Sequence, residues 1–507
     1  MKNKMQAMLL GFLLAGLVGC TAVEQTFAPA AVPNEGVAEN ATISEATLPT
    51  TTDTSTSTNN RRQTINTEGL DRRIYVDFFG VRVIDNNGDL WGWGDASLLG
   101  NNSTENALIP VKIMSNVRSI LDNTTVVDDD NNLWDWSGGG WGFPMISWLG
   151  DELELTSTPA MIFENFQELI RLPTQVIGTG DNREMFELSY ILTKNGQLIH
   201  LSTGVLVMEN VKTTYTPLSN TIIFIITTDN ILWGWGANDV GQLGIGTFAN
   251  IAYPTQTPTP IMENVEKVVS TTFGSTFMLR TDGSVWATGR NHLGQLGNGN
   301  FENINTPQFI MDNVAYIHAW DWGANSSVFA ITKDNVLYSW GTNEFGQLGN
   351  GTFNDRNTPT RVMENVIAIF NTSEATMFAL SEDSVLWGWG RNEFAELGDG
   401  TMFTTQNTPV RIMDNVFTMV GGRVLTNNNE LWAWGSNHNY RLGDGTSDYR
   451  TTPVHIMDNV HFIHDRFAIT NDNVLWAWGE NDRGQLGDGT FIDRNLPVRI
   501  MENVRIP

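Results

Sequence analysis

The sequence contains a single cysteine, Cys20, among 507 residues. One thiol cannot form an internal disulfide, and it cannot supply the several thiolates of a Cys-based zinc site. Basic residues are also scarce, because 29 Lys and Arg stand against 56 Asp and Glu, giving a formal net charge of −27. Such a surface repels phosphate backbones, so we expect no nucleic-acid binding.

Signatures of common catalytic and nucleotide sites are missing as well. The chain has no Gly-x-x-x-x-Gly-Lys-Ser/Thr loop, no His-Glu-x-x-His pair and no Gly-x-Ser-x-Gly elbow. Its glycines recur in every good repeat, whereas a nucleotide site is needed once, so they are expected to form turns. Paired carboxylates stay possible because acidic residues are abundant. We expect a chain without enzymatic activity and without a cofactor.

No apolar run is long enough to span a bilayer, which takes roughly 20 residues. The N-terminal run, Met8 to Val18, has 11 residues and follows Lys2 and Lys4, which is typical of a signal peptide. It ends in Leu-Val-Gly-Cys20, which resembles the lipobox of bacterial lipoproteins. This resemblance implies a signal peptide over residues 1–19, a lipid on Cys20, and an extracytoplasmic protein anchored to a bacterial membrane at the cell surface. An ordinary signal peptide with an incidental cysteine is the alternative.

Residues 20–72 have few large apolar side chains. The run from Thr50 to Thr58 consists of Thr, Ser and one Asp, a composition that cannot bury enough surface to order itself. We interpret residues 20–72 as a flexible, lipid-anchored linker between the membrane and a folded domain at residues 73–507.

The folded domain is a series of repeats. The clearest copy, Leu475 to Thr490, reads Leu-Trp-Ala-Trp-Gly-Glu-Asn-Asp-Arg-Gly-Gln-Leu-Gly-Asp-Gly-Thr. Two markers each count nine units. The first marker is the first Trp of this pattern, or the residue that replaces it, and the second is a closing Ile/Val-Met/Phe-x-Asn motif that recurs every 44 to 54 residues. Repeats with this period indicate a propeller or a solenoid.

Each unit has the features of short antiparallel strands. In the last unit, an apolar stretch at 467–470 and another at 474–478 flank the turn Asn471-Asp472-Asn473. Asn, Asp and Gly suit such turns because they tolerate positive φ. Long helical periodicities are absent. We therefore predict an all-β propeller in which the C-terminus supplies a strand to the first blade and closes the ring.

The repeat resembles that of the regulator of chromosome condensation (RCC1) family. The residues that carry this resemblance are the Trp-Gly-x-Asn-x-x-Gly-Gln-Leu-Gly-x-Gly-Thr stretches that begin at Trp235, Trp340 and Trp478. It implies a β-propeller, usually of seven blades, that serves as an interaction ring. Some members promote nucleotide exchange on a small GTPase, and a bacterial relative inhibits a secreted enzyme by clamping it. This chain departs from the family with nine countable units, of which the second and third are irregular.

Within the repeat, constant and variable positions have different expected roles. Fourteen of the 18 tryptophans occupy the Trp-x-Trp positions, where packing between blades is favoured over a sugar-stacking platform. The Asp-rich stretch Asp85 to Asp89 lies at a hairpin tip, and Leu90 stands where a calcium loop needs Gly, so no metal site is expected. A packing residue must repeat, whereas a residue that recognises a partner need not.

The variable positions of the Asn-x-x-Gly loop are therefore the candidates for protein binding. They are His292, Glu344, Phe345, Glu393, Phe394, Tyr440, Asp482 and Arg483. A second set of aromatic residues follows the Gly-x-Gly segment: Phe248, Phe301, Phe353, Phe403, Tyr449 and Phe491. The second set either studs the same rim for protein recognition or tucks under the neighbouring loops as additional core.

The leading hypothesis is a cell-surface lipoprotein whose propeller is a non-catalytic platform for an unidentified protein partner. One alternative, from the resemblance, is exchange activity on a small GTPase. Another is a propeller that binds or processes carbohydrate, with cell-wall glycan as its ligand.

Overall fold

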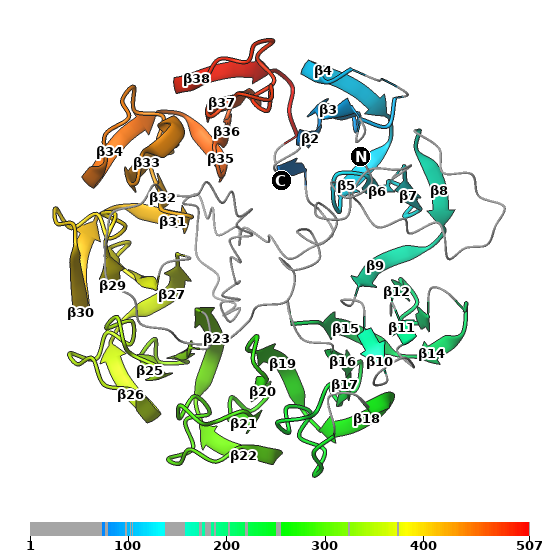
Figure 1. Cartoon of the computed structure of the whole chain (residues 1–507), viewed down its shortest axis with the longest axis vertical. Coiled ribbons are helices and arrows are strands. Elements are labelled where there is room, and N and C mark those ends of the chain that lie inside the picture. The colour runs from blue at the N-terminus through cyan, green and yellow to red at the C-terminus, as the bar shows by residue number, and fades with distance from the viewer. Residues whose placement is uncertain are drawn as a thin grey trace, which may run out of the picture. The chain divides into compact units, whose positions relative to one another are not determined.

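The computed structural model describes residues 73–136 and 158–505, apart from short gaps at 77–79, 97–98, 102, 104, 172–174, 178–183, 187–188, 201–202, 218–221, 250–254, 323–324 and 373–374. The predicted signal peptide, Cys20 and linker lie outside these residues. The described part is almost entirely β-strand and forms nine four-stranded antiparallel sheets arranged as the blades of a propeller (Figure 1). The predicted fold class, an all-β propeller of nine repeat units, is confirmed, and the chain departs from the usual seven blades.

The first five blades include the two irregular copies of the repeat, in blades 2 and 3. Blade 1 consists of β1 (Ile74–Val76), β2 (Gly80–Ile84), β3 (Leu90–Gly94) and β4 (Ala107–Met114), and blade 2 of β5 (Val117–Ile120), β6 (Thr125–Asp128), β7 (Leu133–Asp135) and β8 (Ala160–Phe163). Blade 3 consists of β9 (Phe166–Arg171), β12 (Ser189–Thr193), β13 (Leu198–His200) and β14 (Leu206–Met208), and blade 4 of β15 (Val211–Tyr215), β16 (Ile222–Thr227), β17 (Leu232–Gly236) and β18 (Thr255–Met262). Blade 5 consists of β19 (Val265–Ser270), β20 (Ser275–Arg280), β21 (Val285–Gly289) and β22 (Ile304–Met311).

Blades six to nine complete the ring. Blade 6 consists of β23 (Val314–Trp322), β24 (Asn325–Thr332), β25 (Leu337–Gly341) and β26 (Arg356–Met363), and blade 7 of β27 (Val366–Asn371), β28 (Thr376–Ser381), β29 (Leu386–Asn392) and β30 (Thr404–Met413). Blade 8 consists of β31 (Val416–Val420), β32 (Arg423–Thr426), β33 (Leu431–Gly435) and β34 (Arg450–Met457), and blade 9 of β35 (Val460–His464), β36 (Phe467–Thr470), β37 (Leu475–Gly479) and β38 (Arg494–Met501). A short 3₁₀ turn, η3 (His438–Tyr440), follows β33. No helix among the described residues is long and apolar enough to cross a membrane.

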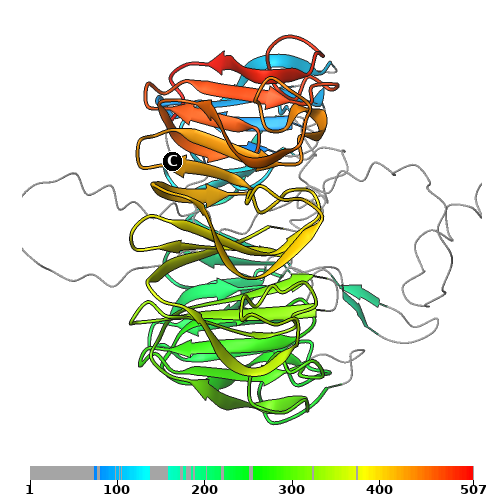
Figure 2. The same ribbon diagram turned by 90° about the vertical axis from the view of Figure 1, so that its left-hand side faces the viewer.

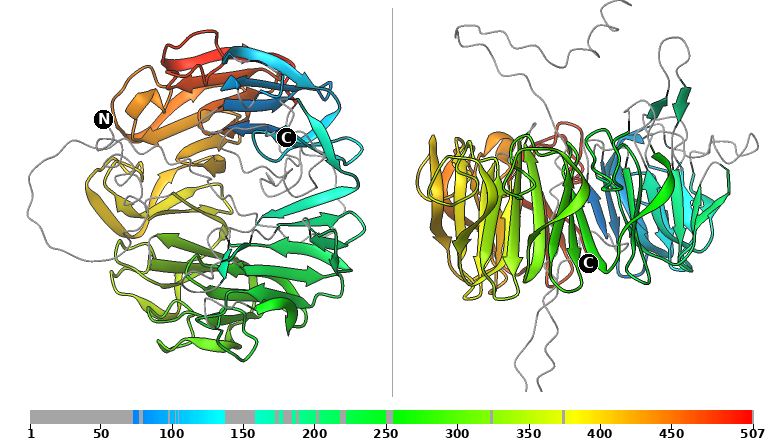
Figure 3. Two further views of the ribbon diagram at one scale, coloured as in Figure 1. Left: turned by 45° about the vertical axis from the view of Figure 1, so that its right-hand side comes forward. Right: turned by 90° about the horizontal axis from the view of Figure 1, so that it is seen from below.

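Blade 3 carries an insertion between its first and second strands. There β10 (Gln175–Ile177) pairs with β11 (Glu184–Phe186) as a separate two-stranded hairpin. Seen edge-on, the blades form a disc, and this hairpin stands out from its body (Figures 2 and 3).

The closing motif of each unit works as a turn between blades. Its Asn has a positive φ of 57° to 64° in all nine units, at Asn116, Asn165, Asn210, Asn264, Asn313, Asn365, Asn415, Asn459 and Asn503. Among residues with a side chain, Asn adopts this left-handed conformation most readily, which explains why the motif keeps it. The Val that follows donates its N–H to a carbonyl at the preceding hairpin tip, as Val460 does to Asn429 at 2.8 Å.

The C-terminus repeats this junction across the ring closure. Val504 N–H donates to Asn473 O at 2.9 Å, and Asn86 N–H donates to Asn503 O at 2.8 Å. Val504 also forms a single antiparallel bridge with Asp85. Blade 9 is thus joined to blade 1 by the same bonds that join the internal blades.

The innermost strand of blade 1 is therefore assembled from both ends of the domain. Next to the Val504 bridge, Arg505 N–H donates to Ile84 O at 3.0 Å and Ile84 N–H donates to Arg73 O at 2.9 Å. Strand β1 then continues the pairing along β2. The ring closes through the C-terminus as expected, but the C-terminus contributes one bridge rather than a whole strand.

The core lies between the blades, and the second Trp of each Trp-x-Trp pair is its largest component. Trp93, Trp340, Trp389 and Trp478 are fully buried. In the well-formed blades the indole N–H donates to a backbone carbonyl in the loop of the preceding blade, for example Trp340 Nε1 to Gln295 O at 3.0 Å and Trp389 Nε1 to Gln347 O at 2.7 Å. These tryptophans pack between blades, as predicted, and both the indole ring and its polar group are satisfied there.

Candidate protein-binding face

The loop between the third and fourth strands of each blade, here called the 3–4 loop, carries all the candidate residues. Every blade has the same strand order and direction, so these loops leave the third strands at the same end and lie on one face of the ring. The connections between first and second strands emerge on this face too.

The Asn of the repeat organises the 3–4 loop from inside. Asn481 is fully buried, and its Nδ2 donates to Asp488 Oδ1 and to Thr490 O, both at 3.0 Å. Its Oδ1 accepts the N–H of Leu486 at 2.9 Å. Asn343 makes the equivalent bonds in blade 6, including one from Leu348 N–H at 2.9 Å. The constant Asn is scaffold.

The Gln of the repeat caps the tip of the same loop. Gln485 Oε1 accepts the N–H of Arg483 at 2.8 Å, and its main-chain O accepts the indole N–H of Trp93 at 2.9 Å. Gln347 does the same for Phe345 N–H at 2.9 Å. The loop is therefore held rigidly against the next blade, and only the variable side chains project from it.

The eight candidate residues lie on the 3–4 loops of five consecutive blades, 5 to 9. His292, Glu344, Phe394, Asp482 and Arg483 are exposed, and Phe345, Glu393 and Tyr440 are half-buried. They follow an arc along one face instead of forming a single cluster, because each blade contributes its own loop. Their role in protein binding stays a prediction.

Two of these loops are linked by an arginine that the sequence patterns did not single out. Arg391 lies between them, with its guanidinium carbon 5.5 Å from the Phe345 ring centroid and its Nη2 2.5 Å from Glu393 Oε2. The hydrogen bond from Arg391 holds the pKa of Glu393 below its usual range. Arg391 follows a constant Trp-Gly pair at a position that varies between blades, and that variation was the available signal.

His292 has a similar neighbour. Arg290 Nε donates to His292 Nδ1 at 2.9 Å, and the Arg290 guanidinium carbon lies 5.4 Å from the ring centroid of Phe273. Partial burial, with a smaller contribution from the Arg290 charge, lowers the pKa of His292. The imidazole is therefore expected to be neutral at neutral pH, with Arg290 as the local positive charge.

The second set of aromatic residues is exposed. Their exposed fractions range from 46% for Tyr449 to 72% for Phe403, and the set comprises Phe248, Phe301, Phe353, Phe403, Tyr449 and Phe491. The interpretation that they tuck under neighbouring loops is wrong. Rings such as Phe301 and Phe353 pack beside the glycine of their own loop. The contact is close: a Cβ on Gly294 would lie 3.2 Å from the Phe301 ring, and a Cβ on Gly346 would lie 3.1 Å from the Phe353 ring.

The constant frame matches a known repeat. The model of the regulator of chromosome condensation (RCC1) repeat matches residues 229–279, 282–327, 334–376, 428–464 and 472–506. These five segments of the chain are RCC1 repeats. The matched segments cover parts of blades 4 to 9, where the loop Asn is constant, and they leave out most of blade 7 and the copies before residue 229.

Curated relatives share part of this RCC1-repeat chain. Human protein RCC2 is 39% identical over 133 residues, which cover 25% of this chain and 24% of RCC2. The human X-linked retinitis pigmentosa GTPase regulator is 36% identical over 127 residues, or 25% of this chain and 12% of that protein. The chain thus spans a quarter or less of the length of these relatives.

Solved structures have lower similarity. Human WBSCR16 is 21% identical with a TM-score of 0.40, covering 64% of this chain and 88% of that one. Prp20p of Saccharomyces cerevisiae is 18% identical with a TM-score of 0.39, covering 56% of this chain and 76% of that one.

Proposed function

We propose that this RCC1-repeat propeller is a non-catalytic binding platform for another protein, held at the outer side of a bacterial membrane by a lipid on Cys20. The observation that carries the proposal is the exposed aromatic set on the 3–4 loop face. Six blades each present a large ring two to four residues after the Gly-x-Gly segment, and these rings are exposed by 46% to 72%. Extended apolar surface of this kind is typical of interaction sites, and aromatic side chains are enriched where proteins meet.

Charged side chains surround these aromatic rings. Glu344, Asp482 and Arg483 are exposed on the same loops, and Phe394 stacks with Tyr449 of the next blade at 6.5 Å between ring centroids. Aromatic anchors within a charged rim are the usual arrangement of a protein interface. The net charge of −27 favours a basic partner, because complementary charge speeds association.

The test compares a variant of this face with a matched variant elsewhere on the chain. The face variant combines Phe301→Ser, Phe353→Ser and Phe491→Ser. The control is Phe309→Arg, on the outermost strand β22, where Phe309 is 52% exposed. Phe309 on the outermost strand pairs with Trp286 on the strand beside it. At the equivalent position of blades 6, 7 and 9 the outermost strand has an arginine (Arg361, Arg411 and Arg499), so the fold accommodates Arg there.

The full chain is immobilised and presented with the proteins of its extracellular surroundings. A partner captured by the unaltered chain should bind the face variant at least ten-fold more weakly, since interface aromatics typically contribute more than ~1 kcal/mol each. The control should bind as the unaltered chain does. Capture that the face variant retains in full would contradict the proposal. If the immobilised chain retained cell-wall glycan and the face variant did not, carbohydrate binding would be favoured over the platform. If the chain accelerated nucleotide release from a purified small GTPase, exchange activity would be favoured.

A further inference from the structure

The glycine of the 3–4 loop normally lies directly against the following blade. A Cβ on Gly294 would lie 2.6 Å from Asn357 Cβ, and a Cβ on Gly346 would lie 2.9 Å from Asn407 Cα. Both contacts are closer than a real Cβ tolerates, and both glycines have positive φ. Blade 7 has Ala395 at this position, fully buried and with a φ of 64°, so a methyl group is accommodated there. A side chain much larger than a methyl group is expected to separate the loop tip from the next blade.

Blade 8 has such a residue, because Tyr440 occupies the glycine position. Its assignment to the variable positions of the loop is therefore corrected: in this blade those positions are His438 and Asn439. The next residue is Arg441 in place of Gln, and an arginine side chain has no acceptor with which to cap the loop. The loop forms the turn η3 instead, with φ of 54° at Asn439 and 57° at Tyr440. Non-glycine residues in this region carry strain, which persists when the surroundings hold it in place and is found most often at binding sites.

The junction with blade 9 stays intact below the altered tip. Trp478 Nε1 still donates to Arg441 O at 3.0 Å, as the equivalent Trp does in the other regular blades. Gly445 N–H donates to Asn495 O at 2.7 Å, and Asn495 Nδ2 donates to Gly445 O at 3.0 Å. The blades therefore remain joined while the loop tips are apart.

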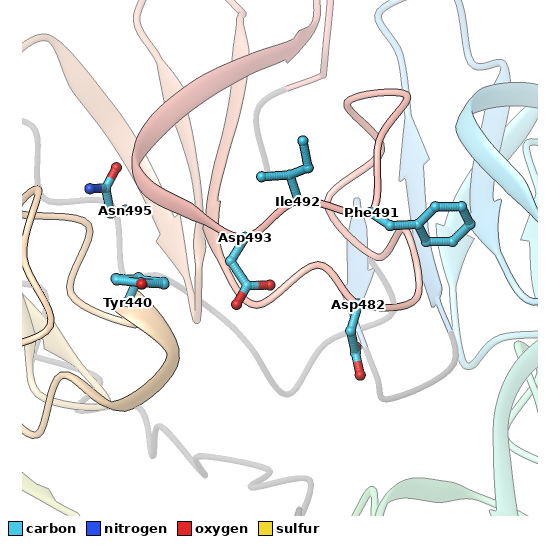
Figure 4. A pocket seen from close by; sticks show the side chains of 6 residues that line it. All are labelled: Tyr440, Asp482, Phe491, Ile492, Asp493 and Asn495. Atoms are coloured by element: carbon cyan, nitrogen blue, oxygen red, sulfur yellow. The ribbon is translucent and has the colours of Figure 1, made fainter.

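An open surface pocket of about 610 Å³ lies between these tips, so a group bound there stays partly exposed to solvent. It is lined by Tyr440, Asp482, Phe491, Ile492, Asp493 and Asn495. In Figure 4, Tyr440 and Asn495 lie on one side, Asp482 lies on the other, and the Asp493 carboxylate projects between them. Ile492 is 61% exposed at the edge.

The polar groups of the pocket are negative or neutral. Asp493 Oδ1 accepts the N–H of Asn481 at 2.7 Å, and Asp482 Oδ1 accepts from Gln485 Nε2 at 3.2 Å. Each carboxylate has capacity for further hydrogen bonds through its other oxygen. The pocket therefore combines two carboxylates with the ring of a tyrosine.

This combination suits a planar cation. Carboxylates take guanidinium groups in paired, charge-assisted hydrogen bonds, and aromatic faces attract the same group through their π electrons. Arginine uses both interactions better than lysine because its charged group is flat and less strongly hydrated. Arg483 is a competing cation, because its Nε lies 4.0 Å from Asp482 Oδ1 and its side chain is about half exposed.

We propose that the pocket between blades 8 and 9 binds an arginine side chain presented by the partner protein. This rests on the proposed platform function and names the chemistry of one contact. The charge of −27 attracts a basic segment to the ring, Asp493 and Asp482 hold the guanidinium, and Tyr440 covers its face.

The experiment titrates the full chain with a blocked tripeptide, acetyl-Gly-Arg-Gly-amide, and follows binding by saturation-transfer NMR. The citrulline peptide is the neutral control of equal shape. The arginine peptide should bind saturably in the millimolar range, and the citrulline peptide should bind at least five-fold more weakly, as expected for loss of a charge-assisted contact. Arg483→Gln should strengthen arginine binding about two-fold, because it removes the competing cation.

Two variants test the lining residues. Asp493→Asn should weaken arginine binding at least five-fold, and it should fold because Asn303 accepts the equivalent bond in blade 5, from Asn291 N–H at 2.8 Å. Asp355→Asn in blade 6 is its control, since Asp355 accepts the same bond from Asn343 and the charge change is identical. Tyr440→Gly restores the glycine of the repeat and removes the tyrosine ring, so it should abolish saturable binding.

Several outcomes would overturn the arginine site. They are the absence of saturable arginine binding by the unaltered chain, equal binding of arginine and citrulline peptides, and equal effects of Asp493→Asn and Asp355→Asn. Binding of free glucosamine as tight as that of the arginine peptide would assign the pocket to an amino sugar and so reject a protein occupant. The platform itself is tested by the face variant, which changes Phe301, Phe353 and Phe491, and only Phe491 of these lines the pocket. If the face variant loses binding of the protein partner while Asp493→Asn binds that partner normally, the arginine site is rejected and the platform is not.

Discussion

Gly487 at the ring closure offers a sharp test of how the blades are joined. The fully buried Trp93 of blade 1 lies directly over this glycine of blade 9, and its indole N–H donates to Gln485 O at 2.9 Å. A Cβ on Gly487 would lie 2.6 Å from Trp93 Nε1, and Gly487 has a φ of +77°. Gly487→Ala therefore adds both backbone strain and a steric clash with a rigid ring.

The two costs can be separated with a matched glycine. Gly422 has a φ of +79°, and a Cβ at this residue would have no neighbour within 4 Å. Gly422→Ala should lower the free energy of unfolding by about 1 kcal/mol, from loss of left-handed freedom alone. Gly487→Ala should lower it by about 2 to 4 kcal/mol, because overpacking adds about 1 to 3 kcal/mol.

Urea unfolding followed by tryptophan fluorescence would measure the difference. In a chain that already carries Trp93→Leu, the extra cost of Gly487→Ala should shrink toward the Gly422 value, because the clashing ring is gone. Equal destabilisation by the two glycine substitutions, or no change in the Trp93→Leu background, would refute the direct packing of blade 1 on blade 9.

Three further predictions concern the C-terminus, acid stability and anchoring. Removing residues 503–507 deletes the bonds of Val504 and should lower the melting temperature and speed amide exchange in strand β2; unchanged exchange there would contradict closure through the C-terminus. Burial lowers the pKa of His318 from 6.5 to about 4, although its hydrogen bond with Asn371 acts in the opposite direction. As the pH falls, the His318 imidazole is therefore protonated in the unfolded chain before it is protonated in the folded chain. Stability should therefore drop by up to about 3 kcal/mol between pH 6.5 and 4, and the drop should be smaller in His318→Gln, as measured by urea unfolding across that range. Cys20→Ser should move the chain from the detergent to the aqueous phase in a phase-partition assay, and an unchanged distribution would contradict lipid anchoring.

The architecture could be predicted because each junction reuses the same local chemistry. The Asn of the closing motif marks a left-handed turn, and the Trp-x-Trp pair marks the packing between blades, so counting these residues counts the blades. The assembly of the first blade could not be predicted in full. Its inner strand joins Arg73 and β1 to Val504, and no local pattern shows how two distant segments divide one strand.

The candidate face could be predicted only in part. The variable loop positions were found because they depart from a constant frame, yet whether Phe301 and its equivalents are buried depends on the space left by the neighbouring blade. Tyr440 stood out as a departure, but its consequence needed the structure: only there is the equivalent glycine seen in contact with the next blade. Arg391 was missed because its importance lies in contacts between loops far apart in sequence.

The most direct test of the platform is a hydrogen-exchange footprint of the chain with its captured protein partner. We expect slower amide exchange in the 3–4 loops of blades 5 to 9, around Phe301, Phe353 and Phe491, and unchanged exchange in the outermost strands β22 and β38. Protection confined to those outer strands, or to the hairpin tips on the opposite face, would show that the exposed aromatic set is not where the partner binds.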